Sequence, residues 1–140
     1  MLLVVFHQLE SQILIYYLMN KIVFFLLLPF FVLSQQDNFY EILKQDEFKE
    51  NINKEGRLLF DIRTMEEFNL GHIEGAINID YYEQKLFLNF FNKIEKSKPI
   101  YIYCRSGNRS RKSSEILKKI GFVKVYDLEG GYKNWVNSTN

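Results

Sequence analysis

The chain has 140 residues, a formal net charge of +1, a hydrophobic content of 47% and one cysteine. This length accommodates one domain with a targeting segment and leaves no room for two catalytic domains, while the hydrophobic content suffices for a buried core. The near-neutral charge argues against nucleic-acid binding, and the lone cysteine excludes an intramolecular disulfide or a zinc site built from several cysteines.

The first 34 residues differ from the rest in their charge content, because Glu10 and Lys21 are their only charged residues. Residues 22–33 form an unbroken apolar run, shorter than the roughly 20 residues that a membrane-spanning helix needs. Such a run directly after a lysine is typical of a signal peptide. We therefore expect residues 1–34 to be a leader, with translation starting at Met19, cleavage after Ser34, and export, in a bacterium to the periplasm.

Two alternatives remain open for this segment. Residues 13–33 would form an uncleaved membrane anchor if Lys21 were accommodated in the bilayer, at a cost of about 2.5–3.5 kcal/mol. The segment would otherwise be a buried helix of the fold. Contact with a membrane is expected only if the leader is retained, and in the first two interpretations the folded domain comprises residues 35–140.

Short apolar runs alternate with amphipathic segments through residues 35–140. The apolar runs predict strands at residues 39–43, 58–62, 76–79, 99–103 and 122–126. Capping residues and helical spacing predict helices at residues 46–54, 64–71, 82–94 and 108–120, and a last one after Gly130 and Gly131. Asn38 and Glu41 form a competing capping-box pattern, which would place a helix where the first strand is expected.

The helical spacing also predicts which side chains face the core. In the helix at 82–94 the apolar positions are Leu86, Phe87, Phe90, Phe91 and Ile94. In the helix at 108–120 they are Ile116, Leu117 and Ile120. Strands joined by crossover helices imply an α/β fold, in which one parallel sheet of about five strands has helices on both faces. Ligands of such sheets bind beyond the carboxyl ends of the strands.

The candidate nucleophile, Cys104, directly follows the strand at 99–103. The loop after it turns into a helix, so we expect backbone N–H groups and a helix N-terminus to surround the sulfur and favour the thiolate. Arg105 and Arg109 add positive charge, and Gly107 allows a left-handed backbone conformation. The alternative is an inert core thiol, which would not need two arginines and a glycine within five residues.

Four segments of this sequence together resemble the rhodanese-like sulfurtransferases of the small single-domain type. They are residues 59–63 with Glu67 and Phe68, residues 71–78, residues 103–110, and Gly130 and Gly131 with Trp135. The resemblance extends from about residue 39 to residue 136. It implies a central parallel sheet and sulfur transfer through a persulfide on the cysteine, with no metal or organic cofactor.

For this chain, the resemblance implies a catalytic Cys104 that takes sulfur from a small anionic donor such as thiosulfate. The expected acceptor is a thiol or a protein, the expected state is a monomer, and no nucleic acid is involved. The residues expected to bind the donor follow the cysteine: Arg105, Ser106, Gly107, Asn108, Arg109 and Ser110. The alternative is a binding or sulfur-carrier module of the same fold with little turnover.

The length of this loop separates sulfur transfer from phosphatase chemistry. Related cell-cycle phosphatases have a loop that is one residue longer and an arginine six positions after the cysteine. In this chain that position is Ser110, and Arg109 lies five positions after Cys104. The spacing therefore resembles the sulfurtransferases.

Other polar residues near the expected site have two interpretations each. The resemblance implies that Asp61 and Arg63 support neighbouring loops, while the alternative for Arg63 is binding of the donor anion. His72 is expected to be a structural histidine rather than a general base. Trp135 is expected to pack against the domain rather than line the entrance.

Overall fold

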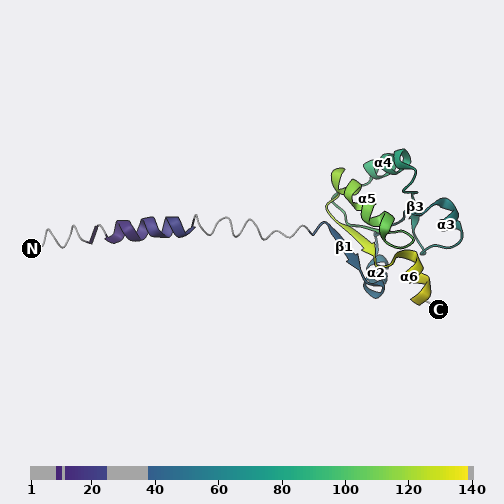
Figure 1. Ribbon diagram of the computed structural model, residues 1–140, viewed down its shortest axis with the longest axis horizontal. Coiled ribbons are helices and arrows are strands. Elements are labelled where there is room, and N and C mark those ends of the chain that lie inside the picture. Colours follow the sequence, from purple (N-terminus) through teal and green to yellow (C-terminus); the bar gives the residue numbers. More distant parts are fainter. Residues whose placement is uncertain (1–8, 11, 25–37, 139–140) are drawn as a thin grey trace, which may run out of the picture. The chain divides into compact units, whose positions relative to one another are not determined.

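The computed structural model describes residues 9–10, 12–24 and 38–138 of the chain (Figure 1). Residues 12–24 form a helix with exposed side chains, and the compact unit begins at Asn38. Among the described residues, no helix has both the length and the apolar character needed to cross a membrane. Most of the apolar run expected to be the core of a signal peptide, and its cleavage position after Ser34, lie outside the described residues.

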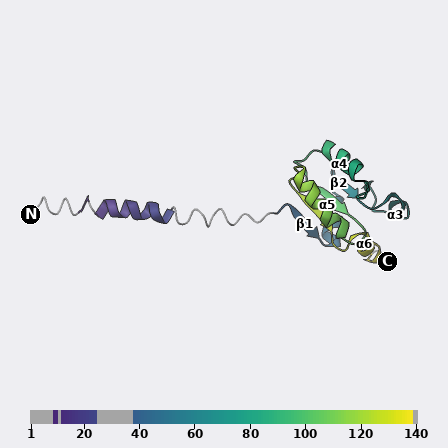
Figure 2. The same ribbon diagram turned by 45° about the horizontal axis from the view of Figure 1, so that its top comes forward.

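A five-stranded parallel sheet forms the centre of the compact unit, in the order β1-β5-β4-β2-β3. Figures 1 and 2 show this unit from two directions. The strands are β1 (Tyr40–Leu43), β2 (Leu58–Asp61), β3 (Ile77–Asn78), β4 (Ile100–Tyr103) and β5 (Val125–Leu128). The helices between and after them are α2 (Gln45–Ile52), α3 (Met65–Asn69), α4 (Gln84–Lys93), α5 (Asn108–Lys119) and α6 (Gly131–Ser138). The predicted α/β fold is confirmed.

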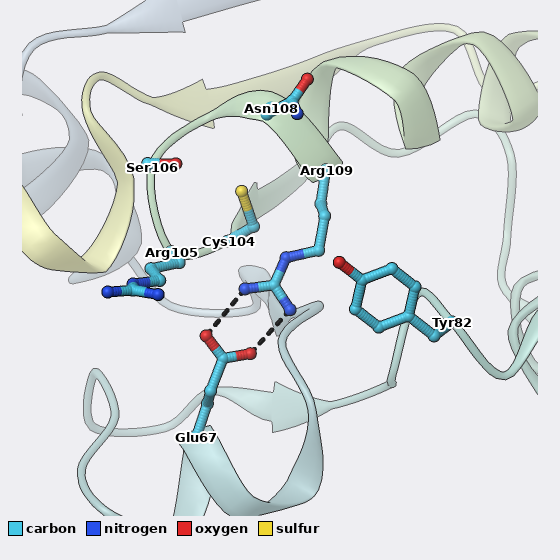
Figure 3. A pocket seen from close by; sticks show the side chains of 7 residues that line it. All are labelled: Glu67, Tyr82, Cys104, Arg105, Ser106, Asn108 and Arg109. Carbon is cyan, nitrogen blue, oxygen red and sulfur yellow. Dashed lines mark hydrogen bonds and ion pairs between the residues drawn. The ribbon is translucent and has the colours of Figure 1, made fainter.

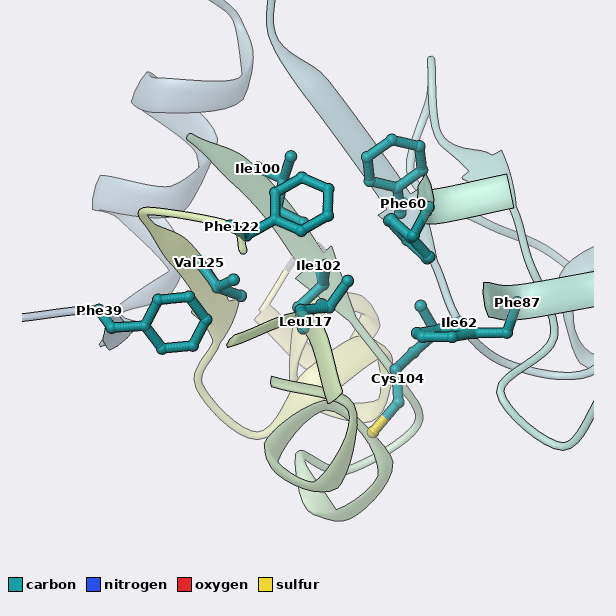
Figure 4. Packing of buried hydrophobic residues seen from close by; sticks show 11 residues of the cluster. Phe39, Phe60, Ile62, Phe87, Ile100, Ile102, Cys104, Leu117, Phe122 and Val125 are labelled. Carbon is teal, nitrogen blue, oxygen red and sulfur yellow. The ribbon is translucent and has the colours of Figure 1, made fainter. Parts of the chain in front are cut away.

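Two clusters of buried side chains cover the two faces of the sheet. One joins strand residues such as Phe60 and Ile102 to Phe87 and Phe91 of α4 and Leu117 of α5. Figure 4 shows part of this cluster, with Cys104 at its edge. The other cluster joins strand residues to side chains of α2 and α6: Leu59, Tyr101, Phe48, Tyr132 and Trp135. Because the central strand β4 is buried on both faces, its carboxyl end is held rigidly in the interior.

The last strand begins later than predicted, at Val125 rather than at Phe122. The Gly121 and Phe122 amides donate to the carbonyls of Lys118 and Leu117, which ends α5 in a Schellman motif with Gly121 at φ 97°. Phe122 packs against Leu117 in the same core cluster. Phe122 therefore belongs to the end of a helix. The prediction placed it in a strand because its side chain is apolar.

The predicted start of α2 and part of the predicted core face of α4 are also wrong. Lys44, not Asp46, is the N-cap residue of α2, and its side chain makes no capping hydrogen bond. The competing helix from Asn38 is excluded because β1 begins at Tyr40 and pairs with β5. In α4, Leu86 is 64% exposed, since Phe87 and Phe91 take the buried positions.

Candidate active site

Cys104 directly follows β4, and residues 105–107 connect it to the first turn of α5. Gly107 is the N-cap residue of α5 and has φ 92°, a left-handed conformation that favours glycine. The connection therefore curls back on itself, and Figure 3 shows the Cys104 sulfur pointing into this curl. The sequence predicted the position of the cysteine after the strand, and the left-handed conformation that Gly107 allows is the one it adopts.

The Cys104 side chain lies at the base of the loop and contacts polar groups from α5. The Gly107 backbone N–H donates to the Cys104 Sγ at 3.1 Å, and the Ser110 Oγ lies 3.6 Å from the same sulfur. The residue is 1% exposed, although it lines a pocket. An N–H group directed at the sulfur at the N-terminus of a helix favours negative charge there.

The carbonyl groups at the start of the loop point away from the sulfur, toward α6. The amides of Tyr132 and Lys133 donate to the carbonyls of Cys104 and Arg105, at 2.8 and 3.0 Å. This contact requires glycine at position 131, because a Cβ there would lie 2.5 Å from the Cys104 carbonyl oxygen. The start of α6 thus fixes the orientation of the peptide groups that form the loop.

A polar pocket of about 310 Å³ opens above the cysteine (Figure 3). Its lining residues come from the loop, from α3, from α5 and from the turn before α4: Glu67, Tyr82, Cys104, Arg105, Ser106, Asn108 and Arg109. The structure therefore brings together at the pocket four of the six residues predicted to bind the donor. The other two, Gly107 and Ser110, contact the sulfur from the loop and from α5.

The two arginines of the loop differ in their partners. Arg109 makes a bidentate ion pair with Glu67, with nitrogen–oxygen distances of 2.6 and 2.8 Å, and it lies over the ring of Tyr82. The side-chain hydrogen bond and the charge of Glu67 raise the pKa of Arg109 although burial opposes this, and the same pair lowers the pKa of Glu67. The charge of Arg109 at the pocket is thus largely neutralised.

Arg105 is exposed, and no described residue forms an ion pair or hydrogen bond with its guanidinium group. In Figure 3 its side chain lies on the opposite side of the pocket from Tyr82. Among the pocket residues it therefore carries the positive charge that remains available to an anion.

Asp61 and Arg63 lie at the end of β2, and neither lines the pocket. They form a buried ion pair, and Arg63 also donates to the Gly71 carbonyl at 2.7 Å and lies over the Tyr132 ring at 3.9 Å. Burial opposes the charge of Arg63, but the hydrogen bonds to Asp61 outweigh this and raise its pKa. The pair connects β2, the turn at Gly71 and α6.

His72 and Trp135 lie outside the pocket lining. The His72 Nδ1 is 3.1 Å from the Phe68 carbonyl oxygen, and the imidazole stacks on the Phe68 ring. Trp135 packs against the core cluster that faces α2 and α6.

The sequence did not point to Glu67 or Tyr82 as pocket residues. Thr64 and Glu67, three residues apart, have the pattern of a capping box, which the structure contains: the Thr64 N–H donates to the Glu67 carboxylate and the Thr64 hydroxyl accepts from the Glu67 N–H. The same carboxylate binds Arg109. The signal in the sequence for Glu67 is an acidic residue on a short helix that follows the end of a strand. The sequence around Tyr82 contains no comparable signal.

Comparison with known proteins agrees with this geometry. Residues 44–138 match the family described as the Rhodanese-like domain. The chain belongs to the rhodanese family. Sulfurtransferase-type activity is accordingly supported in broad terms by the family and by relatives that carry that name.

The relatives of this rhodanese-like chain include proteins of similar size. It is 36% identical over 100 residues to the uncharacterized protein YqhL of Bacillus subtilis, covering 71% of this chain and 75% of that protein. It is 31% identical over 103 residues to the thiosulfate sulfurtransferase GlpE of Glaesserella parasuis, covering 74% of this chain and 92% of that protein. A relative named tRNA uridine(34) hydroxylase, from Pelagibacter ubique, is 37% identical over 87 residues, but the chain spans only 29% of its length.

A solved structure has the same fold. The rhodanese-related protein of Thermoplasma volcanium superposes with a TM-score of 0.60 at 28% identity, covering 71% of this chain and 93% of that one. The arrangement of sheet and helices described above is therefore the one found in the family.

Proposed function

We propose that the protein is a thiosulfate sulfurtransferase that transfers the outer sulfur of a thiosulfate-like donor to a thiol through a persulfide on Cys104. The observation that carries the proposal is the cysteine at the base of a polar pocket. Its sulfur accepts a hydrogen bond from the Gly107 N–H, and the Cys104 and Arg105 carbonyls are held away from it by α6. This polarity favours an anionic sulfur, which is the nucleophilic form.

Arg105 is suited to bind the anionic end of the donor. It is the exposed cation of the pocket, whereas the charge of Arg109 is offset by Glu67. Ser106 and Asn108 also line the pocket and offer side-chain donors. In this arrangement the sulfonate end of thiosulfate lies toward Arg105, and the outer sulfur points down to Cys104.

Sulfur transfer then proceeds in two balanced steps. The Cys104 thiolate attacks the outer sulfur of thiosulfate, a bond forms between the two sulfurs, and the sulfur–sulfur bond of the donor breaks as sulfite leaves with the electron pair. The persulfide left on Cys104 is an anion, which the Gly107 N–H and the helix N-terminus also stabilise. An acceptor thiolate next attacks its outer sulfur and releases the Cys104 thiolate. Covalent catalysis thus divides one difficult transfer into two easier ones.

The test is intact-mass measurement after incubation of the protein with thiosulfate. Because Cys104 is the single cysteine, a gain of one sulfur atom that cyanide removes as thiocyanate can be assigned to it. Cys104→Ser should show neither the gain nor thiocyanate formation and should keep the far-ultraviolet circular dichroism of the unchanged protein. Thiocyanate formation by Cys104→Ser at a comparable rate would exclude the persulfide route.

A sulfur-carrier role without rapid turnover is the second candidate. It is favoured by the 1% exposure of Cys104 and by a relative named putative sulfur carrier protein YrkF of Bacillus subtilis, which is 33% identical over 93 residues. The chain spans 49% of that relative. A carrier would gain the sulfur atom slowly or only from a protein donor, whereas the enzyme gains it from thiosulfate and shows repeated turnover with cyanide.

We also propose that residues 1–34 direct export and are removed. The composition of this segment supports the proposal, with the apolar run at residues 22–33 following Lys21. Expression of the full chain in a bacterial host, followed by N-terminal sequencing of the periplasmic product, tests it. A product that begins at Gln35 is expected, and a product retained in the membrane fraction with its leader would show an anchor.

A further inference from the structure

Asp127 is a buried acid that the reaction above does not use. It lies on β5, pairs with Ile102 of β4 and Ile42 of β1 in the register of the sheet, and is 1% exposed. A carboxylate in the interior of a parallel sheet is costly unless hydrogen bonds or a cation compensate it. The hydrogen-bond donors and cations around Asp127 therefore determine how its carboxyl group is stabilised.

The partners of Asp127 are hydroxyl groups. The Ser110 Oγ donates to the Asp127 Oδ2 at 2.6 Å, and the Tyr40 hydroxyl donates to the same oxygen at 2.5 Å. The other oxygen, Oδ1, is buried and accepts no hydrogen bond from any described residue. The same Ser110 Oγ lies 3.6 Å from the Cys104 Sγ, so one hydroxyl group lies between the nucleophile and the buried acid.

The hydroxyl of Ser110 has one hydrogen and two lone pairs. While that hydrogen is directed at the Asp127 carboxylate, the oxygen presents a lone pair to the sulfur. A thiol proton on Cys104 can then be donated to the Ser110 Oγ. The Gly107 carbonyl, 3.1 Å from the Ser110 Oγ, is a second acceptor for that hydrogen, but the contact with Asp127 is shorter, at 2.6 Å. With the hydrogen directed at Asp127, the hydrogen bonds run in one direction, from the sulfur through the serine to the acid.

We propose that Asp127 accepts the thiol proton of Cys104 through Ser110. The Cys104 S–H bond breaks as its proton binds the Ser110 oxygen, and the original hydroxyl proton of Ser110 moves to the Asp127 Oδ2. The products are a thiolate and a neutral carboxylic acid, with no net change in charge or protons. The Ser110 hydrogen now points to the sulfur and, together with the Gly107 N–H, stabilises the thiolate. Asp127 is thus a positioning residue that acts through Ser110.

The electrostatic surroundings allow Asp127 to hold a proton near neutral pH. Burial raises its pKa to about 6, although the hydrogen bonds from Ser110 and Tyr40 oppose the rise. The titratable groups facing it are Tyr40 on β1, by direct hydrogen bond, and Cys104 after β4, through Ser110. The positive charge of Arg111 on α5 lowers the pKa of Tyr40, opposing the rise caused by burial and Asp127. On α6, which also packs on β5, the Tyr132 ring lies against Arg63 and Lys133 is exposed. No cation among the described residues forms an ion pair with Asp127.

The pH profile of Cys104 alkylation by iodoacetamide tests the relay. A thiol and an acid that share one proton contain a fixed thiolate fraction between their two macroscopic ionisations. The unchanged protein should therefore show a plateau of reactivity above an inflection near pH 6, followed by a second rise at higher pH. A single inflection in the unchanged protein, without a plateau, would overturn the proposal.

Two variants identify the groups responsible for the plateau. Asp127→Asn cannot accept the proton, and Ser110→Ala removes the hydrogen bonds that couple the two ionisations. In both variants reactivity should fall about tenfold per pH unit below one inflection. At pH 6.5 the loss relative to the unchanged protein should be at least about tenfold, and above the upper inflection the rates should converge. Either variant suffices if the other fails to fold, and a plateau that persists in a folded variant refutes the relay.

Tyr40→Phe is the matched control, because it removes the other hydroxyl partner of Asp127 and leaves the path to Cys104 intact. It should keep the plateau and move the lower inflection to higher pH, since one hydrogen bond to the carboxylate is lost. A purely structural role of the buried network would instead alter Tyr40→Phe and Asp127→Asn alike. Alkylation needs no sulfur donor, so its result is independent of whether thiosulfate is the substrate.

Discussion

Two buried aspartates lie near the carboxyl ends of β2 and β5, the two strands that flank β4, and they are accommodated differently. Asp61 on β2 is fully buried and forms an ion pair with Arg63, which also binds the Gly71 carbonyl. Asp127 on β5 is equally buried, but hydroxyl groups surround it. A cation therefore compensates Asp61, whereas Asp127 has hydroxyl partners and a pKa raised by burial. The ion pair of Asp61 suits a residue that supports neighbouring loops. The hydroxyl partners of Asp127 suit a residue that exchanges a proton with the nearby cysteine.

The same contrast distinguishes the two arginines of the loop. Arg109 is paired with Glu67 and joins α5 to α3, while Arg105 is exposed at the pocket without an ion-pair partner among the described residues. Substitution of a residue in an ion pair should therefore mainly lower the free energy of unfolding. Substitution of a charged residue without an ion-pair partner should mainly change the reaction at Cys104. Four substitutions, in order of decreasing effect, test this distinction.

Arg63→Leu should destabilise the protein most, by about 3–5 kcal/mol, because Asp61 would remain buried without its cation. Urea unfolding followed by circular dichroism measures the loss. The double variant Asp61→Asn with Arg63→Leu should recover part of it, since no uncompensated charge is then buried. A loss below about 1 kcal/mol for the single variant would show that Asp61 is accommodated without the pair.

Asp127→Asn should change how stability depends on pH. The pKa of Asp127 rises from 3.8 to about 6 on folding, so the folded state binds more protons than the unfolded state between these values. Its contribution to stability is present in full below about pH 3.8 and is lost as the pH rises through 6. The stability of Asp127→Asn relative to the unchanged protein should thus increase by about 3 kcal/mol between pH 3.5 and pH 8. A difference that does not vary with pH would contradict the raised pKa.

Glu67→Gln should destabilise the domain by about 1 kcal/mol, because it breaks a partly exposed bidentate ion pair while keeping the shape of the side chain. It should also leave Arg109 unpaired at the pocket and so lower the Michaelis constant for thiosulfate. Thermal unfolding and steady-state kinetics measure the two effects. An unchanged Michaelis constant together with lost stability would assign Glu67 to support alone.

Arg105→Ala should have the smallest effect on stability, within about 0.5 kcal/mol, because the side chain is exposed. Its effect on the reaction should be a higher Michaelis constant for thiosulfate, since the available cation of the pocket is removed. Arg105→Lys serves as the control, as it keeps the charge. Equal Michaelis constants for all three proteins would show that the donor anion is bound elsewhere.

The parts of the site that are contiguous in sequence could be predicted from it. The segment from Cys104 to Ser110 was identified because cysteine, glycine and arginines occur within seven residues between a strand and a helix. Gly107 has the left-handed conformation that a glycine allows at this position. The capping box of Thr64 was likewise predictable, because its two partners are three residues apart.

Contacts between distant segments could not be predicted in this way. The pairing of Glu67 with Arg109 and of Asp127 with Ser110 depends on how α3 and β5 lie beside α5. The buried face of α5 consists largely of serines, at positions 110, 113 and 114, which a search for apolar side chains overlooks. The signal for Asp127 in the sequence is an acidic residue within an otherwise apolar strand. The strand predicted at residues 122–126 did not include Asp127, whereas β5 extends to Leu128.

The contact between α6 and the Cys104 loop makes the geometry of the loop depend on a segment that follows it by more than twenty residues. The Tyr132 and Lys133 amides are the partners of the Cys104 and Arg105 carbonyls, and glycine at position 131 allows their close approach. Displacement of α6 would therefore leave both carbonyls without the partners that orient them, even if the sheet stayed intact.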